Sequence, residues 1–563
     1  MIKRDLAPKL MRAAHQFPSI TLTGPRQSGK TTLCKAVFPQ HPYTTLEAPD
    51  VRAFATEDPR GFLDQFPEGA VIDEVQRVPD LLSYLQVCID ADPQPGRWIL
   101  TGSQNLSLRN SISQSLAGRT AVYHLLPLTR SEIVRFDRHP QSLEETLLAG
   151  AYPRIFDRDL DPADWLRSYV ATYIERDVRA ISNVGDLVTF QRFVELCAGR
   201  TAQLLNYSSL AGDCGISQPS AKAWLSILEA SFVTFRLPAF HSNLRKRLVK
   251  MPKLHFCDTG LVCWLLGIRT PEHLRSHPLR GPIFETWVVS EIVKHRANRG
   301  ETGVHGLSFY RDRNGAEADL IIEHPARLTL VEAKSAKTAS SSWFDGARRV
   351  WRHLTALPRR CDVVVCYGGD QFQRRADGEL TPWSRLREVG LGESAFSVSV
   401  SADDRPIAGA RVLALSPNNT RKEAGTDKSG EAILDLHSAH PPLTIFVAAA
   451  GLAAHVERDW IPAERALNVE LSTLPNGGAV IFENATGQVP ILQGRLNPIL
   501  DNLGRTYLHA DNIAINGGLR QPVDFTLGEE LHLADAEGRE ASVRIVKIVG
   551  RSVLVQYRQV RPV

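Results

Sequence analysis

Over the first 130 residues, short apolar or β-branched runs alternate with longer stretches of helical spacing. This alternation is typical of βαβ units, which build a parallel sheet. A helix is expected over Leu81–Cys88, for example. The expected strands are Ser19–Thr23, Tyr43–Leu46, Ala70–Asp73, Trp98–Thr101 and Ala121–His124. The pattern therefore predicts an α/β domain over residues 1–130.

The pattern changes further along the chain. Residues 131–275 are mostly helical, and residues 276–390 return to mixed α/β. Gly390, Gly392 and Ser394 mark a joint, after which short alternating strands are separated by turn residues. This predicts two all-β domains, 395–472 and 473–563. The second has an expected hairpin between Ser542–Val549 and Ser552–Tyr557.

Composition places the chain among ordinary globular proteins. Its 563 residues carry 66 Lys and Arg against 62 Asp and Glu, a net charge of +4. Residues 1–394 hold 50 basic and 43 acidic residues, whereas 395–563 hold 16 and 19, so a nucleic-acid partner would belong to the first part. None of the eight cysteines forms a CxxC pair, which argues against structural zinc. The charged start and the lack of a long apolar run predict a cytoplasmic protein without a membrane span.

One glycine-rich loop has the pattern of a phosphate-binding site. Gly24-Pro25-Arg26-Gln27-Ser28-Gly29-Lys30-Thr31 fits GxxxxGK[ST] and lies between an expected strand and a helix. Backbone N–H groups of these residues and of Thr32 are expected to surround the phosphates of ATP. Lys30 would reach the β- and γ-phosphates, and Thr31 would ligate Mg²⁺.

Polar residues at other strand ends supply the rest of the expected ATPase site. Asp73 and Glu74 follow a buried strand; Asp73 would hold Mg²⁺ and Glu74 would polarise the attacking water. Ser103, after the next strand, is expected to contact the γ-phosphate. Arg119 would stabilise transition-state charge within the chain or across a subunit boundary; the alternative is a solvated helix cap.

These motifs resemble a prokaryotic AAA-type ATPase family. The likeness rests on the loop, on Ile72–Gln76, Thr101–Ser103 and Leu116–Arg119, and also on Tyr173–Val178 and Lys253–Gly260. It covers about residues 1–390. The resemblance implies an ATPase module, a winged helix and a nuclease-like module, in that order.

A helix-turn-helix is expected within a winged helix at about 190–257. Ser208–Ser217 forms a short helix and a turn, and Pro219–Glu229 forms a second helix with Gln218, Lys222 and Ser226 exposed. Residues 232–237 would be the following strand. Ala230–Cys257 contains no acidic residue, which predicts contact with DNA; the alternative is a protein-packing module. The basic residues there are Arg236, Arg245, Lys246, Arg247, Lys250 and Lys253.

Two strands further on carry acidic residues and a lysine in a nuclease-like pattern. Strand alternation puts Glu332 and Lys334 on one face, and a hairpin would bring Asp319 beside them. Asp319 and Glu332 would hold Mg²⁺, Lys334 would help activate water, and Glu285 would be a further ligand. The segments resemble the PD-(D/E)XK nuclease core, a restriction-endonuclease-like α/β fold. The alternative is a nuclease fold kept for binding, or for packing against the ATPase.

The sequence of the C-terminal β tail, residues 395–563, indicates a binding role rather than catalysis. Residues 409–415 and 426–436 resemble a carboxypeptidase-regulatory-like β-sandwich, and residues 473–563 are expected to bind a protein partner or to support homo-oligomerisation. The parts together predict a Mg²⁺-dependent ATPase whose nucleotide state gates the DNA-contacting winged helix and the nuclease-like module, in DNA processing or genome defence. The alternative is a non-nucleolytic ATP-driven switch, or a scaffold, that binds DNA or a partner protein.

Overall fold

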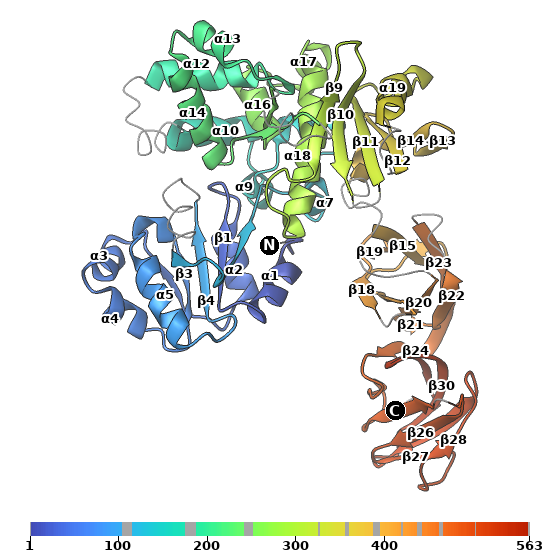
Figure 1. The fold of residues 1–563 in the computed structure, drawn as a ribbon. Helices are drawn as coiled ribbons and strands as arrows, with labels where there is room; N and C mark the ends of the chain where they lie inside the picture. The colour runs from blue at the N-terminus through green and yellow to red at the C-terminus, as the bar shows by residue number, and fades with distance from the viewer. Residues whose placement is uncertain are drawn as a thin grey trace. The chain divides into compact units, whose positions relative to one another are not determined.

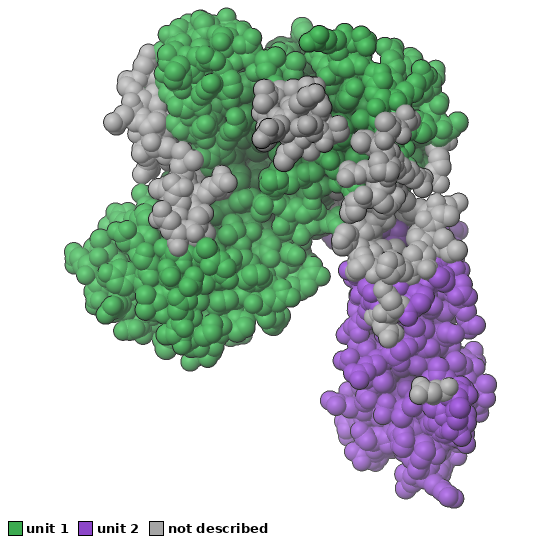
Figure 2. Space-filling model, in the orientation of Figure 1, with its two compact units in different colours: residues 1–390 green, residues 391–563 purple. Residues whose placement is uncertain are grey.

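The computed structural model divides the chain into two compact units, residues 1–390 and 391–563 (Figure 2). The division falls at Gly390, within the joint marked by glycines. Part of the motif at Tyr173–Val178, from Glu175 onward, lies outside the described residues. Residues 241–250 also lie outside them, and they contain four of the six basic residues predicted to contact DNA. The structure describes residues 2–103, 115–174, 187–240, 251–324, 327–354, 360–386, 395–417, 420–435, 442–460, 466–501 and 503–560.

The first domain of unit 1 is a parallel sheet with helices on both faces (Figure 1). Its strand order is β2-β3-β4-β1-β5, and β1 is buried along its whole length. The predicted strands are confirmed to within a residue at each end. The strands are β1 (Ser19–Thr23), β2 (Tyr43–Thr45), β3 (Ala70–Asp73), β4 (Trp98–Gly102) and β5 (Thr120–His124).

Two apolar clusters fill the faces of this sheet. Ile20 and Leu22 of β1 pack with residues of α1 and α2, whereas Ile72 and Leu100 pack with residues of α4 and α5. The sheet thus has a core on each side, and the ends of its strands are left for the loops. The helices are α1 (Ala7–Ala14), α2 (Lys30–Val37), α3 (Pro49–Glu57), α4 (Pro59–Asp64) and α5 (Leu81–Ala91).

The second domain is mainly helical. The two predicted helices of the helix-turn-helix are present as α13 and α14, and the Ser217 hydroxyl accepts from the Ser220 N–H at the start of α14 (3.2 Å). The strand order in its small sheet is β6-β8-β7. The elements are α7 (Arg130–Ile133), α8 (Leu143–Ala149), α9 (Pro153–Asp157), α10 (Pro162–Tyr169), a π-helical turn at Val170–Ile174, α12 (Leu187–Ala198), β6 (Gln203–Leu204), α13 (Tyr207–Cys214), α14 (Gln218–Ala230), β7 (Thr234–Leu237), β8 (Lys253–Phe256), α16 (Thr259–Leu265) and α17 (Pro271–Ser276).

The third domain is a mixed sheet beside a long helix, α18. The strand order is β13-β14-β12-β11-β10-β9, and β10 pairs with β11 as the expected antiparallel hairpin. The elements are α18 (Arg280–Asn298), β9 (Leu307–Arg311), β10 (Glu317–Glu323), β11 (Arg327–Lys334), α19 (Asp345–Leu354), β12 (Arg360–Tyr367), β13 (Gln373–Arg375) and β14 (Gly378–Pro382).

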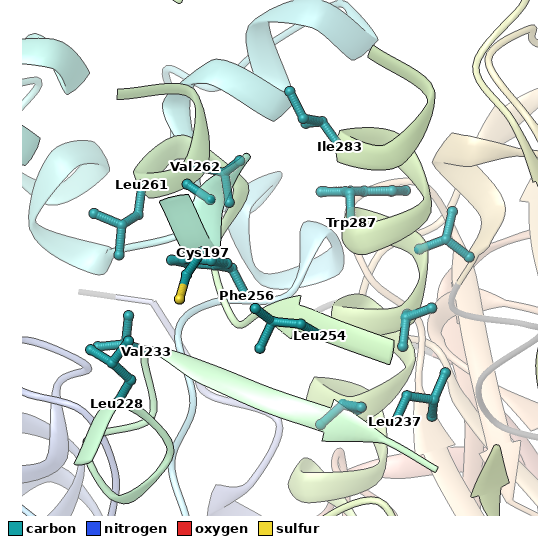
Figure 3. Packing of buried hydrophobic residues seen from close by; sticks show 14 of the residues in the cluster. Cys197, Leu228, Val233, Leu237, Leu254, Phe256, Leu261, Val262, Ile283 and Trp287 are labelled. Atoms are coloured by element: carbon teal, nitrogen blue, oxygen red, sulfur yellow. The ribbon is translucent and has the colours of Figure 1, made fainter. Parts of the chain in front are cut away.

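The second and third domains share one hydrophobic core. Figure 3 shows Leu254 and Phe256 of β8 in the same cluster as Trp287 of α18. Trp287 lies edge-on to Trp383 of the third domain, with ring centroids 5.8 Å apart. The backbone N–H of Phe240 also donates to the carbonyl of Phe309 in β9. The two domains are therefore one packed body.

Unit 2 is built from strands in two halves. In the first half, the orders are β16-β15-β19, with β23 beside β15, and β18-β17-β20-β22. In the second half they are β21-β24-β31-β30-β29-β27 and β25-β26-β28. The predicted hairpin is confirmed as β30 and β31. Because β21 comes from the first half by sequence but pairs with β24, the halves meet through strand pairing.

In the described part of the chain, none of the helices is long and apolar enough to span a membrane.

The bounds of the strands of unit 2 complete the description of the fold. They are β15 (Ala395–Ala402), β16 (Arg405–Pro406), β17 (Arg411–Leu415), β18 (Arg421–Gly425), β19 (Glu431–Asp435), β20 (Leu443–Ala448), β21 (Ala450–Leu452), β22 (His455–Trp460), β23 (Ala466–Glu470), β24 (Thr473–Phe482), β25 (Leu496–Leu500), β26 (Thr506–Ala510), β27 (Ile513–Ile515), β28 (Val523–Asp524), β29 (Glu530–Asp535), β30 (Glu540–Val549) and β31 (Ser552–Gln559).

Candidate functional site

The glycine-rich loop connects β1 to α2 and needs glycine at both ends. Gly24 has φ 153°, and a Cβ there would lie 2.2 Å from the carbonyl oxygen of Leu125. Gly29 has φ 92° and precedes the first residue of α2, Lys30. These backbone angles are strained for any other residue. They let the loop curl at the N-terminus of α2, where free N–H groups favour an anion.

Lys30 lies inside this loop. Its ammonium donates to the carbonyl oxygens of Gly24 (3.1 Å) and Pro25 (2.9 Å). Burial lowers the pKa of Lys30 from 10.5 to about 8, although the nearby Glu74 and Asp73 carboxylates act in the opposite direction. A phosphate would supply the negative charge for the Lys30 ammonium that the two neutral carbonyl groups lack.

Asp73, at the end of β3, is held by three hydroxyl groups. Its Oδ2 accepts from Thr31 Oγ1 (2.7 Å) and from Tyr43 Oη (2.9 Å), and its Oδ1 accepts from Thr101. The predicted pair of Mg²⁺ ligands, Thr31 and Asp73, is thus side by side. Oxygen donors of this kind fit Mg²⁺, which binds one or two carboxylates and completes its shell with water and phosphate.

Tyr43 is a site residue that the sequence did not single out. Burial and the neighbouring Asp73 carboxylate raise its pKa to about 12, so the phenol stays protonated and donates. A tyrosine at the start of a short strand carries no signal of this role.

Glu74 adopts a left-handed backbone conformation, with φ 57°. Gln76 Nε2 donates to its carboxylate and also to Ser103 Oγ (2.9 Å). Ser103 Oγ lies 3.5 Å from Glu74 Oε2. Ser103 therefore lies in the polar group around Glu74, and Gln76 completes that group. Gln76 belongs to the motif that carries the family resemblance, but its role was not predicted.

A cavity of about 1090 Å³ opens over the loop. The sequence placed its lining within the first domain alone, yet residues of the second domain form part of the wall. These are Phe136, Pro153, Arg154, Asp157 and Arg158. The first domain contributes Arg26, Gln27, Gly29, Lys30, Thr31, Thr32, Tyr43, Glu47, Asp73, Glu74 and others. A site of this size fits a ligand such as a nucleotide.

Arg119 is not part of this cavity, so the prediction that it acts on the nucleotide of its own chain is wrong. Arg119 directly precedes β5, which runs parallel to β1 with Thr120 beside Ser19. It therefore lies at the N-terminal ends of the strands, whereas the loop lies at their C-terminal ends. Its guanidinium forms a bidentate ion pair with Asp90 (2.5 and 2.9 Å). Action across a subunit boundary stays a prediction.

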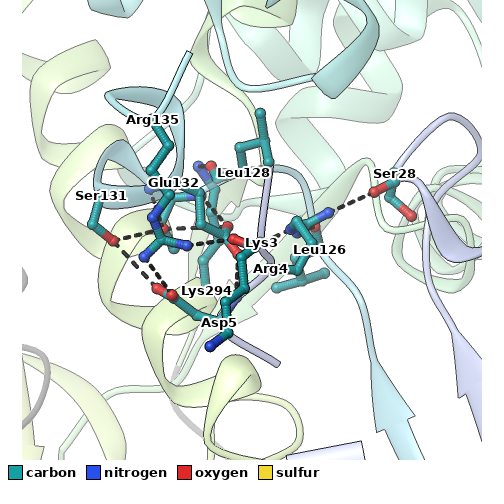
Figure 4. Close-up of polar contacts among 11 residues, drawn as sticks. Lys3, Arg4, Asp5, Ser28, Leu126, Leu128, Ser131, Glu132, Arg135 and Lys294 are labelled. Atoms are coloured by element: carbon teal, nitrogen blue, oxygen red, sulfur yellow. Dashed lines mark hydrogen bonds and ion pairs between the residues drawn. The ribbon is translucent and has the colours of Figure 1, made fainter. Parts of the chain in front are cut away.

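A buried arginine before α1 connects the loop to α7 (Figure 4). The Arg4 guanidinium donates to the Ser28 carbonyl (2.8 Å), the Leu126 carbonyl (2.9 Å) and Glu132 Oε1 (2.9 Å). Arg4 is 7% exposed and Glu132 is fully buried. Glu132 also accepts from the backbone N–H of Asp5 (2.8 Å). The position of the loop is thus tied to that of α7.

The polar contacts continue from α7 to α18. The backbone N–H of Arg130 donates to Glu291 Oε2 (2.8 Å), and Lys294 Nζ donates to Glu291 Oε1 (2.8 Å) and to the Leu128 carbonyl (3.2 Å). Glu291 and Lys294 are both buried. Polar contacts through Arg4, α7 and Glu291 therefore connect the phosphate-binding loop to α18 of the third domain.

The predicted nuclease-like residues come together, but around lysine ammonium groups. Lys253 Nζ lies 2.8 Å from Glu285 Oε1 and 3.5 Å from Asp319 Oδ1. Lys334 Nζ lies 2.6 Å from Glu332 Oε1. The described residues contain no group of three or more His, Cys, Asp or Glu side chains suited to a metal ion. The structure thus brings Glu285, Asp319, Glu332 and Lys334 into one cluster, with Lys253 as an additional cation among them, and the Mg²⁺ site stays a prediction.

Burial and mutual repulsion act strongly on these acids. Burial, together with the Asp319 charge, raises the pKa of Glu332 to about 8 and that of Glu285 well above its ordinary value. Burial alone would lower the pKa of Lys253, but the surrounding carboxylates outweigh it and raise that pKa. The carboxylates therefore favour the charged form of Lys253.

Two of the six basic residues of the predicted DNA-contacting surface lie in the described part of the chain, and both are paired with acids. Arg236 pairs with Glu229 (2.5 and 2.8 Å), and Lys253 is buried among acids, so these two charges are opposed. Gln218, Lys222 and Ser226 of α14 are exposed, as predicted. Contact with DNA through this face stays a prediction.

Three family models match successive parts of unit 1. An AAA domain model matches residues 16–134, and two models described as domains of unknown function, DUF8612 and DUF4143, match residues 140–272 and 280–386. The uncharacterized proteins Rv2008c of Mycobacterium tuberculosis and Mb2031c of Mycobacterium bovis are each 32% identical over 343 residues, which is 60% of this chain and 75% of theirs. The Walker-type ATPase PABY2304 of Pyrococcus abyssi is 15% identical, with a TM-score of 0.33 over 46% of this chain and 94% of that one.

Proposed function

Because the chain belongs to the same family as the two mycobacterial proteins and carries its AAA-type P-loop domain, we propose that it hydrolyses ATP with Mg²⁺ and acts as a nucleotide-driven switch. The observation that carries the proposal is the convergence of Lys30, Thr31, Asp73 and Glu74 on one cavity. A phosphate-binding lysine, two oxygen ligands and a carboxylate for water are the parts that P-loop hydrolysis requires.

Each side chain has a role that its contacts support. Lys30 would leave the Gly24 and Pro25 carbonyls for the phosphates, where its charge opposes theirs. Thr31 and Asp73 would hold Mg²⁺, which neutralises phosphate charge when bound. Glu74 would orient the attacking water and accept its proton, since Gln76 and Ser103 fix the carboxylate.

The switch follows from the walls of the cavity. Arg154 and Arg158 of the second domain line it, so they can respond to the charge of the bound nucleotide. Arg4 connects the loop backbone to Glu132 of α7, next to the contacts with α18. A change in the loop is therefore expected to alter how the first domain packs on the other two.

ATP turnover in Mg²⁺ tests the proposal. We expect Glu74→Gln to lower turnover by at least about 100-fold, the usual contribution of a general base, while ATP still binds. Glu68→Gln changes an exposed acid of the same domain and should leave turnover unchanged. Wild-type protein that binds ATP without turning it over would reduce the proposal to a binding scaffold.

Between a nuclease and a non-nucleolytic switch, the contacts of Lys253 and Lys334 favour the switch. Cleavage of labelled duplex or single-stranded DNA in Mg²⁺ is expected to be absent in the wild type. Cleavage that disappears in Lys334→Ala would restore the nuclease hypothesis.

A second candidate function, binding of nucleic acid, is supported by the exposed polar side of α14. Lys222 and Gln218 lie on the second helix of a helix-turn-helix, the usual reading helix of such motifs. Fluorescence anisotropy of labelled duplex DNA, with and without ATP, tests this. Binding of the wild type is expected to weaken in Lys222→Glu. If the wild type binds no DNA, the switch would act instead on a protein partner of the β tail or on a homo-oligomer.

A further inference from the structure

Lys253 is a buried cation at the centre of the carboxylates of the third domain. It belongs to β8 of the second domain and is 2% exposed. Its ammonium lies 2.8 Å from Glu285 Oε1, 3.0 Å from Glu317 Oε1 and 3.5 Å from Asp319 Oδ1. These carboxylates come from α18 and β10. A side chain of one domain thus occupies the charged centre of the next.

The arrangement suits an ammonium, which has three N–H donors and no acceptor. Lys253 donates a hydrogen bond to Glu285 and forms ion pairs with Glu317 and Asp319. A divalent cation would need the same oxygens at shorter distances. The ammonium and a metal ion therefore cannot occupy this place together.

The other half of the cluster is also held without a metal. Asp319 Oδ2 accepts from the backbone N–H of Ala333 (2.9 Å), and Glu332 Oε1 pairs with Lys334. Glu332 Oε2 is buried and has no hydrogen-bond partner in the described part of the chain. One acceptor thus remains available beside Asp319, although Lys253 already supplies a positive charge among Glu285, Glu317 and Asp319.

We propose that the ammonium of Lys253 takes the place of a divalent cation among Glu285, Glu317 and Asp319, so that the chain supplies its own cation and the third domain binds no metal. The carboxylates then hold β8 and stabilise the joint between the second and third domains. Removal of Lys253 leaves the acids without a counter-charge and creates a site for a divalent cation. This inference does not depend on ATP hydrolysis.

Mn²⁺ binding to the nucleotide-free full chain, followed by electron paramagnetic resonance, tests the proposal. We expect Lys253→Met to bind one more Mn²⁺ per chain than the wild type. The additional ion should be lost in the double variant Lys253→Met, Asp319→Asn, because Asn keeps the acceptor for Ala333 but not the charge. Lys222→Met removes an exposed lysine and should gain no ion. A Lys253→Met protein that folds and gains no Mn²⁺ overturns the proposal.

A second comparison works even if Lys253→Met does not fold. In the wild-type background, Asp319→Asn should leave the number of bound Mn²⁺ ions unchanged, because Lys253 already occupies the cluster. A wild-type protein that loses a Mn²⁺ ion on Asp319→Asn contradicts the proposal. ATP turnover near the wild-type rate in each variant shows that the first domain is intact, which separates this result from a failure of the proposed ATPase function.

Discussion

Arg4 offers the most direct test of how the phosphate-binding loop is held. Replacing Arg4 with Met keeps most of the apolar stem but removes the ion pair to Glu132 and the hydrogen bonds to the Ser28 and Leu126 carbonyls. Glu132 is fully buried, so its charge loses its partner away from water. Removing one member of a buried pair costs about 3–5 kcal/mol.

The remaining contacts of Glu132 set the expected value within this range. The backbone N–H groups of Asp5 (2.8 Å) and Thr129 (2.9 Å) still donate to the carboxylate. Hydrogen bonds to a charged group contribute about 1.5–3 kcal/mol, so we expect the low end, about 3 kcal/mol. The same change should weaken ATP binding, because the Ser28 carbonyl in the loop loses its donor.

Urea unfolding of the nucleotide-free protein measures this loss. A chain with several domains does not unfold in one two-state step, so the comparison uses the transition of the first domain. Arg135→Met is the matched control: Arg135 pairs with Asp5 (2.5 Å) but is partly exposed, and such pairs are worth about 1 kcal/mol or less. If both variants lose the same small amount, the reasoning about the buried Arg4 is refuted.

Three further predictions concern the first domain. Asp73→Asn should raise the Mg²⁺ concentration needed for half-maximal turnover by at least about tenfold, measured by Mg²⁺ titration; an unchanged requirement would remove Asp73 from the metal site. Arg119→Met should leave turnover unchanged in dilute protein, and a loss that appears only at concentrations where chains associate would show action across subunits. Because the folded chain binds the Lys30 proton less tightly than the unfolded chain, its stability relative to Lys30→Met should rise between about pH 8 and 10.5 while ATP affinity falls; a stability difference that stays flat over this range would mean that the pKa of Lys30 is not lowered.

The elements of the first domain could be predicted because their causes are local. β1 is buried along its whole length, so its five residues are all apolar, β-branched or small, and Gly24 and Gly29 have backbone angles that only glycine adopts easily. The neighbouring positions of Thr31 and Asp73 follow from motif spacing in a parallel sheet. Local pattern was enough in these cases.

Residues whose partners are distant in sequence could not be predicted in this way. Arg4 pairs with Glu132, 128 positions later, and nothing near Arg4 in the sequence marks it as buried. Lys253 was interpreted as part of a basic surface, yet its partners are acids of a different domain. Arg119 was placed by its motif, whereas the direction of β5 decides which edge of the sheet it occupies. In each case tertiary packing determines the role.

The core shared by the second and third domains has a consequence for synthesis on the ribosome. Leu254 and Phe256 of β8 pack in one cluster with Trp287 of α18 and Val364 of β12. Domains generally fold as they emerge from the ribosome, which synthesises the chain at about 5–20 residues per second. The segment up to residue 275 therefore leaves the ribosome with an apolar face that is covered first by α18 and completed only when β12 follows, seconds later. During that interval the nascent chain is a substrate for chaperones, whereas the nucleotide-binding sheet can already be complete.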